Sequence, residues 1–196
     1  MSECEKHIAG DAALKETVLS ETLLSGKDSF IPLYRQQVRL PNGKVSYRDI
    51  IRHPGACAIL AIDEKDNVIL ERQWRAPLGC AVWEIPAGKI DLGEPSLVCA
   101  QRELTEETGL VASEWTFLGT LHNALGYSNE HIDVYLARGL KQGERHLDAN
   151  EFLTVTRVPL SRVRTMAATG AITDAKTIGA LFWLDAHLAN LKRDIK

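Results

Sequence analysis

Residues 88–110 read GKIDLGEPSLVCAQRELTEETGL, and this stretch decides how the rest of the chain is interpreted. Pro95 suits the first turn of a helix, where its missing N–H costs nothing, and Gly109 suits the C-terminal stop. The apolar residues that recur at helical spacing and are expected to be buried are Leu97, Ala100 and Leu104. The stretch therefore predicts a loop that leads from Gly88 into a helix over about residues 94–108.

The predicted helix carries three glutamates close together. At about 100° per residue, Glu103 and Glu107 lie one turn apart and Glu106 lies beside them. Like charges at this spacing destabilise a helix by roughly 0.2–0.5 kcal/mol per pair, so we expect Arg102 and cations to offset them. Hard oxygen ligands with room for water suit Mg²⁺, with Mn²⁺ as the alternative. The helix face therefore predicts a divalent-cation site.

Adjacent glutamates alone are typical of a solvated helix, but the spacing of the whole stretch is far more specific. Its seven fixed positions are Gly88, Glu94, Arg102, Glu103, Glu106, Glu107 and Gly109. If each residue type occurs at roughly 6%, a chance match in a chain of this length is on the order of one in a million. The stretch is therefore a motif and not a coincidence of composition.

Composition and charge limit the class of protein. The chain has 196 residues, of which 45% are hydrophobic and 25% charged, so a packed fold is expected. The formal net charge of −3 disfavours a protein that binds a phosphate backbone, and nucleic acid is not an expected partner. The longest apolar runs, such as residues 56–62, are too short to span a bilayer, and the first thirty residues lack a basic start followed by an apolar stretch. A cytoplasmic protein without a membrane partner is expected.

The chain is expected to divide near residue 54, where His53-Pro54-Gly55 interrupts the pattern. Residues 1–54 predict a β-rich N-terminal arm with two extended segments, 29–40 and 44–52, while residues 11–25 have helical spacing at best. Residues 55–196 would form the main domain.

The main domain is predicted to be an α/β (α+β) fold, a mixed β-sheet sandwiched between helices, because strands, one embedded helix, further strands and two terminal helices follow in order. Strands are expected at 56–62, 67–74, 81–85, 115–121, 132–138 and 152–158, and terminal helices at 160–168 and 173–191. Asp185 interrupts the apolar face of the last helix. The four cysteines show no C-x-x-C pair and are expected to be buried thiols.

Residues 170–177 nearly spell a phosphate-binding P-loop, but Ala175 stands where the second glycine should be, and a helical stretch precedes them. We therefore interpret Thr173 or Asp174 as a helix N-cap and Lys176 as a surface charge. Neither H-E-x-x-H nor G-x-S-x-G occurs, so neither a zinc site nor covalent catalysis is predicted.

The motif matches every position of the box G-x5-E-x7-R-E-U-x-E-E-x-G-U, with Leu104 and Leu110 at the bulky aliphatic places, and the chain thus resembles the Nudix hydrolases. This resemblance implies hydrolysis of a nucleoside diphosphate linked to another group, assisted by divalent cations. It also implies a role for four residues of the box: Glu103 and Glu107 as metal ligands, and Arg102 and Glu106 within the catalytic set.

Residues 72–75 and 83–91 resemble the run that leads into the box in ADP-ribose pyrophosphatases, a branch that also cleaves other nucleotide sugars. Residues 170–177 resemble the entry to that branch's C-terminal helix, and the N-terminal arm resembles the one that its members exchange in a homodimer. The resemblance therefore implies cleavage of ADP-ribose to AMP and ribose 5-phosphate by a homodimer.

The same resemblance implies roles for residues outside the box. It places the carbonyl of Ala87 on a metal and Arg75 near the phosphates or the terminal ribose. It makes Glu151 the base on a loop over the metals, with Glu130 as the rival. A base poised over an activated water contributes about 10²–10⁴ in rate.

The arm also carries residues with implied roles. Phe30 and Tyr47 match aromatic rings that hold adenine, and Arg52 matches an arginine that faces a phosphate or the base, although an aromatic residue in a strand more often belongs to the core. One departure from the branch is Leu125, which stands where a proline is usual. Another nucleotide sugar therefore stays open as the substrate. A dinucleotide substrate and a sensor that binds without cleaving are further alternatives.

Overall fold

The structure is a computed structural model of the chain, and it describes residues 13–26, 29, 31–147 and 151–194. The chain forms two compact units. The first unit consists of residues up to His53 together with 124–130, and the second consists of 54–123 together with the residues from His131 onward.

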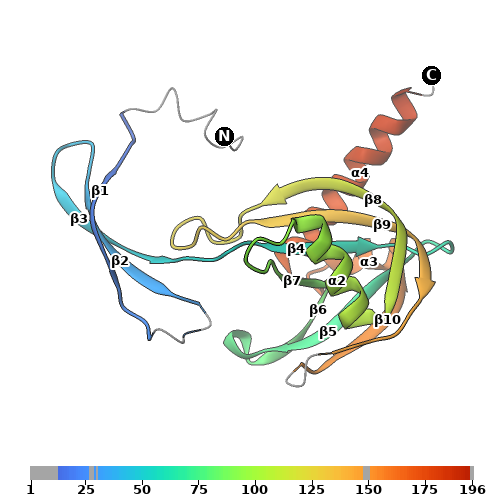
Figure 1. The fold of residues 1–196 in the computed structure, drawn as a ribbon. Coiled ribbons are helices and arrows are strands. Elements are labelled where there is room, and N and C mark those ends of the chain that lie inside the picture. The colour runs from blue at the N-terminus through green and yellow to red at the C-terminus, as the bar shows by residue number, and fades with distance from the viewer. Residues whose placement is uncertain (1–12, 27–28, 30, 148–150, 195–196) are drawn as a thin grey trace. The chain divides into compact units, whose positions relative to one another are not determined.

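The first unit contains a three-stranded antiparallel sheet in the order β1-β2-β3. Its strands are β1 (Thr17–Leu23), β2 (Leu33–Arg39) and β3 (Val45–Ile51) (Figure 1). The expected extended segments 29–40 and 44–52 contain β2 and β3, whereas residues 13–25, the described part of the segment with helical spacing, form no helix and include β1. Residues 17–23 are exposed along their whole length, so the spacing of their apolar side chains does not determine their conformation. It is determined by the pairing of their backbone with β2.

Among its described residues, the second unit contains two sheets and three α-helices (Figure 1). The mixed four-stranded sheet has the order β7-β4-β9-β8 and consists of β4 (Ala56–Ala61), β7 (Ala87–Lys89), β8 (Leu110–Leu121) and β9 (Ile132–Gln142). The antiparallel sheet has the order β10-β5-β6 and consists of β5 (Asn67–Arg75), β6 (Cys80–Glu84) and β10 (Leu153–Pro159), with the 3₁₀ turn η2 (Ala76–Leu78) between the first two. The helices are α2 (Ser96–Thr108), α3 (Leu160–Ala168) and α4 (Ala175–Asp194).

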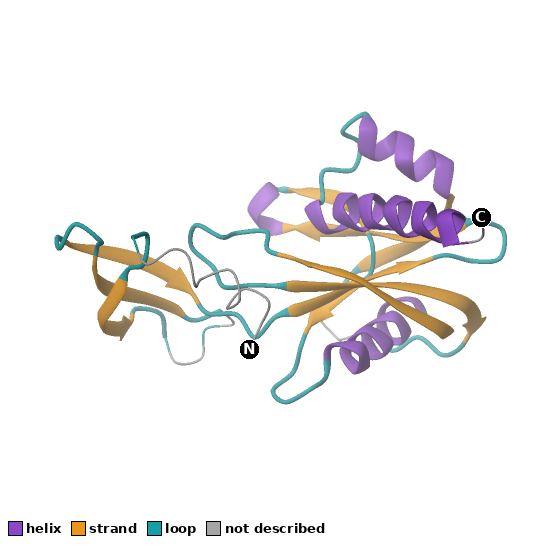
Figure 2. Ribbon diagram, turned by 90° about the horizontal axis from the view of Figure 1, so that it is seen from above, coloured by secondary structure: helices purple, strands orange, loops and turns teal. Residues whose placement is uncertain are grey.

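Strand β4 lies at the centre of the second unit, and it is buried on both faces. Ala58 and Leu60 belong to the core that includes residues of α3 and α4, whereas Cys57 and Ile59 belong to the core that includes residues of α2. Such an uninterrupted apolar strand is typical of a sheet covered by helices on both sides. Figure 2 shows helices on both faces of the strands, which confirms the expected sandwich.

Helix α2 begins at Ser96, two residues later than predicted, and ends at Thr108 with Gly109 as its C-cap. Gly109 adopts a left-handed φ of 70°, which glycine tolerates because it has no Cβ. The amide of Gly109 donates to the carbonyl of Thr105 at 2.8 Å. Leu97 was expected to be buried, but it is 37% exposed, because the buried face of the helix passes instead through Cys99, Ala100 and Leu104.

Helix α4 begins at Ala175, two residues later than predicted, and Asp174, one of the two predicted N-caps, accepts a hydrogen bond from the amide of Thr177 at 3.0 Å. Lys176 is not a surface charge as expected. It is only 9% exposed, and its Nζ lies 2.5 Å from Glu84 Oε2 and 3.0 Å from Asp174 Oδ1, because these carboxylates replace its hydration. The interruption at Asp185 is explained by an ion pair with Arg164 of α3.

The cysteines differ in their exposure to solvent. Cys57 and Cys99 are buried as expected, but Cys80 is exposed at the start of β6. Cys4 lies outside the described residues.

None of the helices in the described ranges has the length and apolar character needed to cross a bilayer.

Candidate active site

Helix α2 presents Glu103 and Glu107 toward the interior of the second unit. Glu107 is 2% exposed, the Glu103 side chain is largely covered, and the Glu106 side chain is considerably more exposed. The three glutamates are therefore adjacent, as the helical spacing predicts, but only two of them are withdrawn from solvent.

Arg102 joins the carboxylates of the box. Its Nε and Nη2 each donate to a different oxygen of Glu94, both at 3.0 Å, while Nη1 donates to Glu103 at 2.7 Å and to Glu106 at 2.9 Å. Hydrogen bonding to Arg102 lowers the pKa of Glu94 to about 2. Arg102 therefore fixes the loop before α2 and two glutamates of the helix in one ionic cluster.

Strand β7 passes directly against these carboxylates. The amide of Ala87 donates to Glu107 Oε2 at 3.0 Å. A β-carbon on Gly88 would stand only 1.9 Å from Cδ of Glu103, so the glycine leaves the space that this carboxylate occupies. Gly88 is therefore required by this close approach and not by a left-handed backbone conformation.

The environment of α2 favours the protonated form of its inward carboxylates in the absence of cations. Burial, followed by the charges of Glu71, Glu103 and Glu151, raises the pKa of Glu107 to about 10. Burial also raises the pKa of Glu103, although Arg102 opposes the shift. A bound cation would reverse this preference, because it favours the ionised carboxylates that ligate it.

A second group of charges lies on β5 and β6, where Glu71 and Glu84 stand opposite each other in the strand register. Glu84 is well compensated: Arg75 donates two hydrogen bonds to it, at 2.8 and 2.7 Å, and Lys176 lies 2.5 Å away. Burial raises the pKa of Glu84, but these partners outweigh burial, so the net shift is downward. Arg75, the predicted substrate-binding arginine, is thereby held in place by a buried carboxylate.

Glu71 has no such compensation. It is 2% exposed, and within the described part of the chain its Oε1 has no hydrogen-bond partner. Burial, followed by the charges of Glu84 and Glu151, raises its pKa to about 8. Sequence reasoning missed this residue, since a single glutamate in a strand belongs to no motif; the one signal was its position directly after the apolar residues 68–70 of β5.

The C-terminal end of α2 is also tied down by a residue that sequence reasoning missed. Arg145 donates through Nε to the carbonyl of Glu107 at 2.5 Å and through Nη2 to the carbonyl of Leu153 at 3.3 Å. A cation at this end of a helix satisfies free carbonyls and interacts favourably with the helix dipole. Arg145 therefore links α2 to the start of β10.

Glu151, the predicted base, lies just before β10, and it accepts a hydrogen bond from Gln73 Nε2 at 3.4 Å. Its charge contributes to the raised pKa values of Glu71, Glu103 and Glu107. The structure therefore brings Glu151 near the inward carboxylates of α2, and its role as a base stays a prediction.

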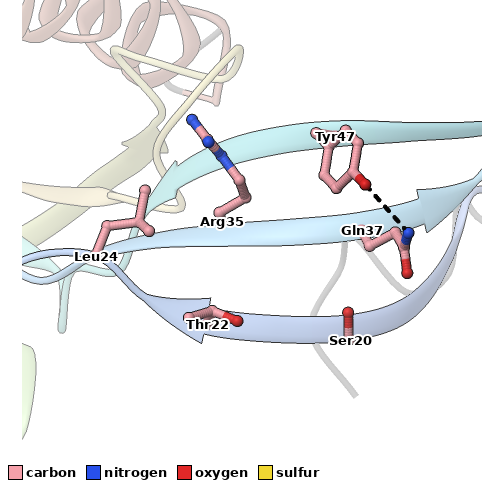
Figure 3. Close-up of a pocket in the computed structure, with 6 residues that line it drawn as sticks. All are labelled: Ser20, Thr22, Leu24, Arg35, Gln37 and Tyr47. Carbon is pink, nitrogen blue, oxygen red and sulfur yellow. Dashed lines mark hydrogen bonds between the residues drawn. The ribbon is translucent and has the colours of Figure 1, made fainter.

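The remaining predicted residues belong to the first unit. Glu130 Oε1 lies 3.7 Å from His53 Nδ1, and Arg52 is paired with Glu21 at 2.8 Å. Tyr47 is exposed and accepts a hydrogen bond from Gln37 at 3.3 Å. It lines a pocket of about 320 Å³ on the sheet, together with Ser20, Thr22, Leu24, Arg35 and Gln37 (Figure 3).

Tyr47 is thus available to a ligand and does not belong to a core. Phe30, the second aromatic residue predicted to hold a base, lies outside the described residues.

The donor set of the second unit fits a divalent cation. Carboxylate oxygens are the ligands that Mg²⁺ and Mn²⁺ prefer. Here Gly88 leaves the space that the Glu103 carboxylate occupies, and among the described residues Oε1 of Glu71 is buried without a hydrogen-bond partner. In the described part of the chain, no three acidic, histidine or cysteine side chains form a ready-made metal cluster. Mg²⁺ commonly takes one or two carboxylates and completes its coordination with water and substrate oxygens.

Comparisons with known proteins agree with this geometry. The family model of the NUDIX domain matches residues 51–181. The ADP-ribose pyrophosphatase of Bacillus subtilis (strain 168) is 39% identical over 172 residues, which cover 87% of this chain and 92% of that protein. The methanol dehydrogenase activator of Bacillus methanolicus is 36% identical over 177 residues, which cover 89% and 95%.

A solved structure supports the same conclusion about the fold. The crystal structure of an ADP compounds hydrolase has a TM-score of 0.79 against this chain at 24% sequence identity, and the match covers 91% of this chain and 97% of that one. The resemblance inferred from residues 88–110 is thereby confirmed, and the chain belongs to the Nudix hydrolase family, whose members act on phosphoanhydride bonds.

Proposed function

We propose that this chain hydrolyses the pyrophosphate bond of a nucleoside diphosphate sugar in a cation-dependent cytoplasmic reaction, with ADP-ribose as the preferred substrate and AMP and ribose 5-phosphate as products. The observation that carries the proposal is the pair of inward carboxylates, the buried Glu107 and the largely covered Glu103, held against Ala87 and Gly88. The name of the Bacillus subtilis relative supports the choice of ADP-ribose.

Glu103, Glu107 and the main-chain carbonyl of Ala87 would hold Mg²⁺, with Mn²⁺ as the alternative. When bound, the cation would supply neutralisation of the pyrophosphate charge and would make a water molecule more acidic. Arg102 would act within the catalytic set by keeping Glu103 and Glu106 in position through its hydrogen bonds.

Glu151 would accept the proton of the attacking water, while Glu130 stays the rival base. The water oxygen forms a bond to one phosphorus, and the bridging oxygen leaves with the other phosphate, so that both products carry a phosphate monoester. Arg75 would bind the phosphates or the terminal ribose with the guanidinium that Glu84 orients.

The first unit would form a homodimer and contribute Phe30, Tyr47 and Arg52 to the substrate site. Exposed apolar side chains support an interface on this sheet: Val18, Leu19, Leu23, Leu24 and Val45. Analytical ultracentrifugation of a chain lacking residues 1–54 should show a monomer, and its KM should rise. The single variant Leu23→Glu should weaken the dimer without removing the sheet. A truncated chain that stays dimeric would refute the role of the arm.

A substrate panel tests the proposed reaction. ADP-ribose, ADP-glucose, GDP-mannose and a dinucleotide are each incubated with the chain and Mg²⁺, and kcat/KM is compared by release of nucleoside monophosphate, because discrimination is measured by that ratio. ADP-ribose should give the highest value and a chelator should abolish it. Preference for another nucleotide sugar would place the change of specificity near Leu125, and no cleavage of any compound would overturn the proposal.

The relative from Bacillus methanolicus favours a second candidate function, in which the chain activates a dehydrogenase. Adding the chain and Mg²⁺ to a methanol dehydrogenase, and measuring the dehydrogenase rate, tests this candidate separately from hydrolysis of ADP-ribose.

A further inference from the structure

The inward side of β5 carries a carboxylate in an environment that does not compensate it. Residues 68–70 of this strand are fully buried and apolar, and Glu71 follows them with the same degree of burial. Burying an ionised group is strongly unfavourable unless a partner replaces its hydration. In the described part of the chain, Oε1 of Glu71 has no hydrogen-bond partner at all.

Two cationic side chains favour the ionised form of Glu71, and both form contacts with other groups. Arg145 and Lys176 are the two whose charges act favourably on Glu71. Arg145 donates to the carbonyls of Glu107 and Leu153, and Lys176 contacts Glu84 and Asp174. Neither supplies the missing partner of Oε1, and the remaining neighbours, Glu84 and Glu151, repel its charge.

Glu71 lies close to the predicted cation ligands. Glu71 stands opposite Glu84 in the strand register, and three residues after Glu84 the amide of Ala87 donates to Glu107 Oε2. Two buried carboxylates so arranged repel each other when both are ionised, and a divalent cation between them removes that repulsion.

We propose that Glu71 is a further carboxylate of the divalent-cation site, supplying negative charge to the cation that Glu103 and Glu107 hold. This inference rests on the proposed function, because it requires that α2 binds a cation. It adds to the site a residue of β5 that lies outside the box, and it accounts for a buried polar oxygen that the fold alone leaves unsatisfied.

Cation binding without substrate tests the proposal directly. Mn²⁺ is titrated into the full chain, and free Mn²⁺ is followed by electron paramagnetic resonance for the wild type, Glu71→Gln, Glu71→Leu and Glu107→Gln. The control is Glu114→Gln, which removes an equal charge from an exposed position on β8. Both Glu71 variants should bind Mn²⁺ about 10–100-fold more weakly than the wild type, as is typical when a supporting residue of a metal site is lost. The control should stay within about twofold.

Thermal unfolding supplies a second readout that does not depend on activity. In the presence of a chelator, Glu71→Leu should have a Tm at least about 2–4 °C above that of the wild type, because an unpartnered buried carboxyl is replaced by an apolar side chain of similar size. Added Mn²⁺ should raise the Tm of the wild type more than that of either Glu71 variant.

The possible failures are distinguishable. If Glu107→Gln weakens Mn²⁺ binding while both Glu71 variants bind as the wild type does, the inference about Glu71 is overturned and the proposed function survives. If the wild type binds no Mn²⁺, or if Glu107→Gln binds it normally, the cation site itself is overturned together with the inference.

Discussion

Gly88 and Glu103 lie so close together that a β-carbon on residue 88 would stand 1.9 Å from Cδ of the glutamate. The two positions are fifteen residues apart in the box, yet one provides the space that the other fills. The carboxylate lies at the end of a flexible side chain, so a larger residue at position 88 would displace the carboxylate before it disturbed the fold.

Gly88→Ala is therefore expected to lower kcat/KM by at least about tenfold, because Glu103 can no longer occupy its place beside β7, while the Tm changes by only a few degrees. Gly93→Ala is the control. Gly93 has a φ of 80° and open space around it, so alanine there should cost about 1 kcal/mol of stability and leave the activity intact. Wild-type activity in Gly88→Ala would show that the close approach has no catalytic consequence.

Glu151→Gln should reduce kcat by about 10²–10⁴ and leave Mn²⁺ binding largely unchanged, because the variant removes a proton acceptor and not one of the proposed cation ligands. Single-turnover rates and Mn²⁺ titrations measure the two properties separately. The matched variant is Glu130→Gln, and a larger loss of kcat in that variant would identify Glu130 as the base.

Lys176→Met should destabilise the fold by at least about 2 kcal/mol. A fully orphaned buried charge costs roughly 3–5 kcal/mol, but Arg75 would still pair with Glu84 in this variant, so the loss is expected below that range. Urea denaturation measures the change in the free energy of unfolding. Lys65→Met, at an exposed turn position, should change it by less than about 0.5 kcal/mol. Equal stability of the two variants would show that the buried contact is weak.

The contribution of Glu94 should depend on pH. Its pKa is lowered to about 2 from an ordinary 4.5, chiefly by hydrogen bonding to Arg102. A carboxyl with a lowered folded-state pKa stabilises the fold above its unfolded pKa, and this stabilisation is lost as the pH falls toward the folded value. Glu94→Gln should therefore lower the free energy of unfolding by about 1–2 kcal/mol near neutral pH.

This difference from the wild type should shrink as the pH is lowered from about 4.5 toward 2. Equilibrium unfolding in urea across this pH range measures the effect. A difference that stays constant at acid pH would mean that Glu94 acts through packing and not through its charge.

The parts of the fold that could be predicted are those with a local signal. The apolar run of β4, the spacing along α2 and the N-cap at Asp174 each follow from neighbouring residues in the sequence. Strand β1 could not be predicted in this way, because its conformation depends on pairing with β2 and its side chains are exposed throughout.

The candidate site likewise contains residues that local sequence predicts and residues that depend on long-range contacts. The box predicts that Glu103 and Glu107 share a helix face, and the structure confirms that they do. The environments of Lys176 and Glu71 depend on contacts between segments that are distant in sequence. A lysine within a near-miss P-loop therefore resembles a surface charge, and a glutamate in a strand matches no motif. Ion pairs such as Arg164 with Asp185 likewise explain polar interruptions only once the helices are packed.

We propose that cation-dependent cleavage of ADP-ribose requires the inward carboxylates of α2. The most direct measurement is kcat/KM for AMP release from ADP-ribose, with and without Mg²⁺, in the wild type, Glu103→Gln and Glu107→Gln. The wild type should need Mg²⁺, and each variant should lose at least about a hundredfold, beyond the 10–100-fold typical of outer-shell residues, with its circular dichroism unchanged. Wild-type rates in both variants, or full activity in a chelator, would contradict the claim.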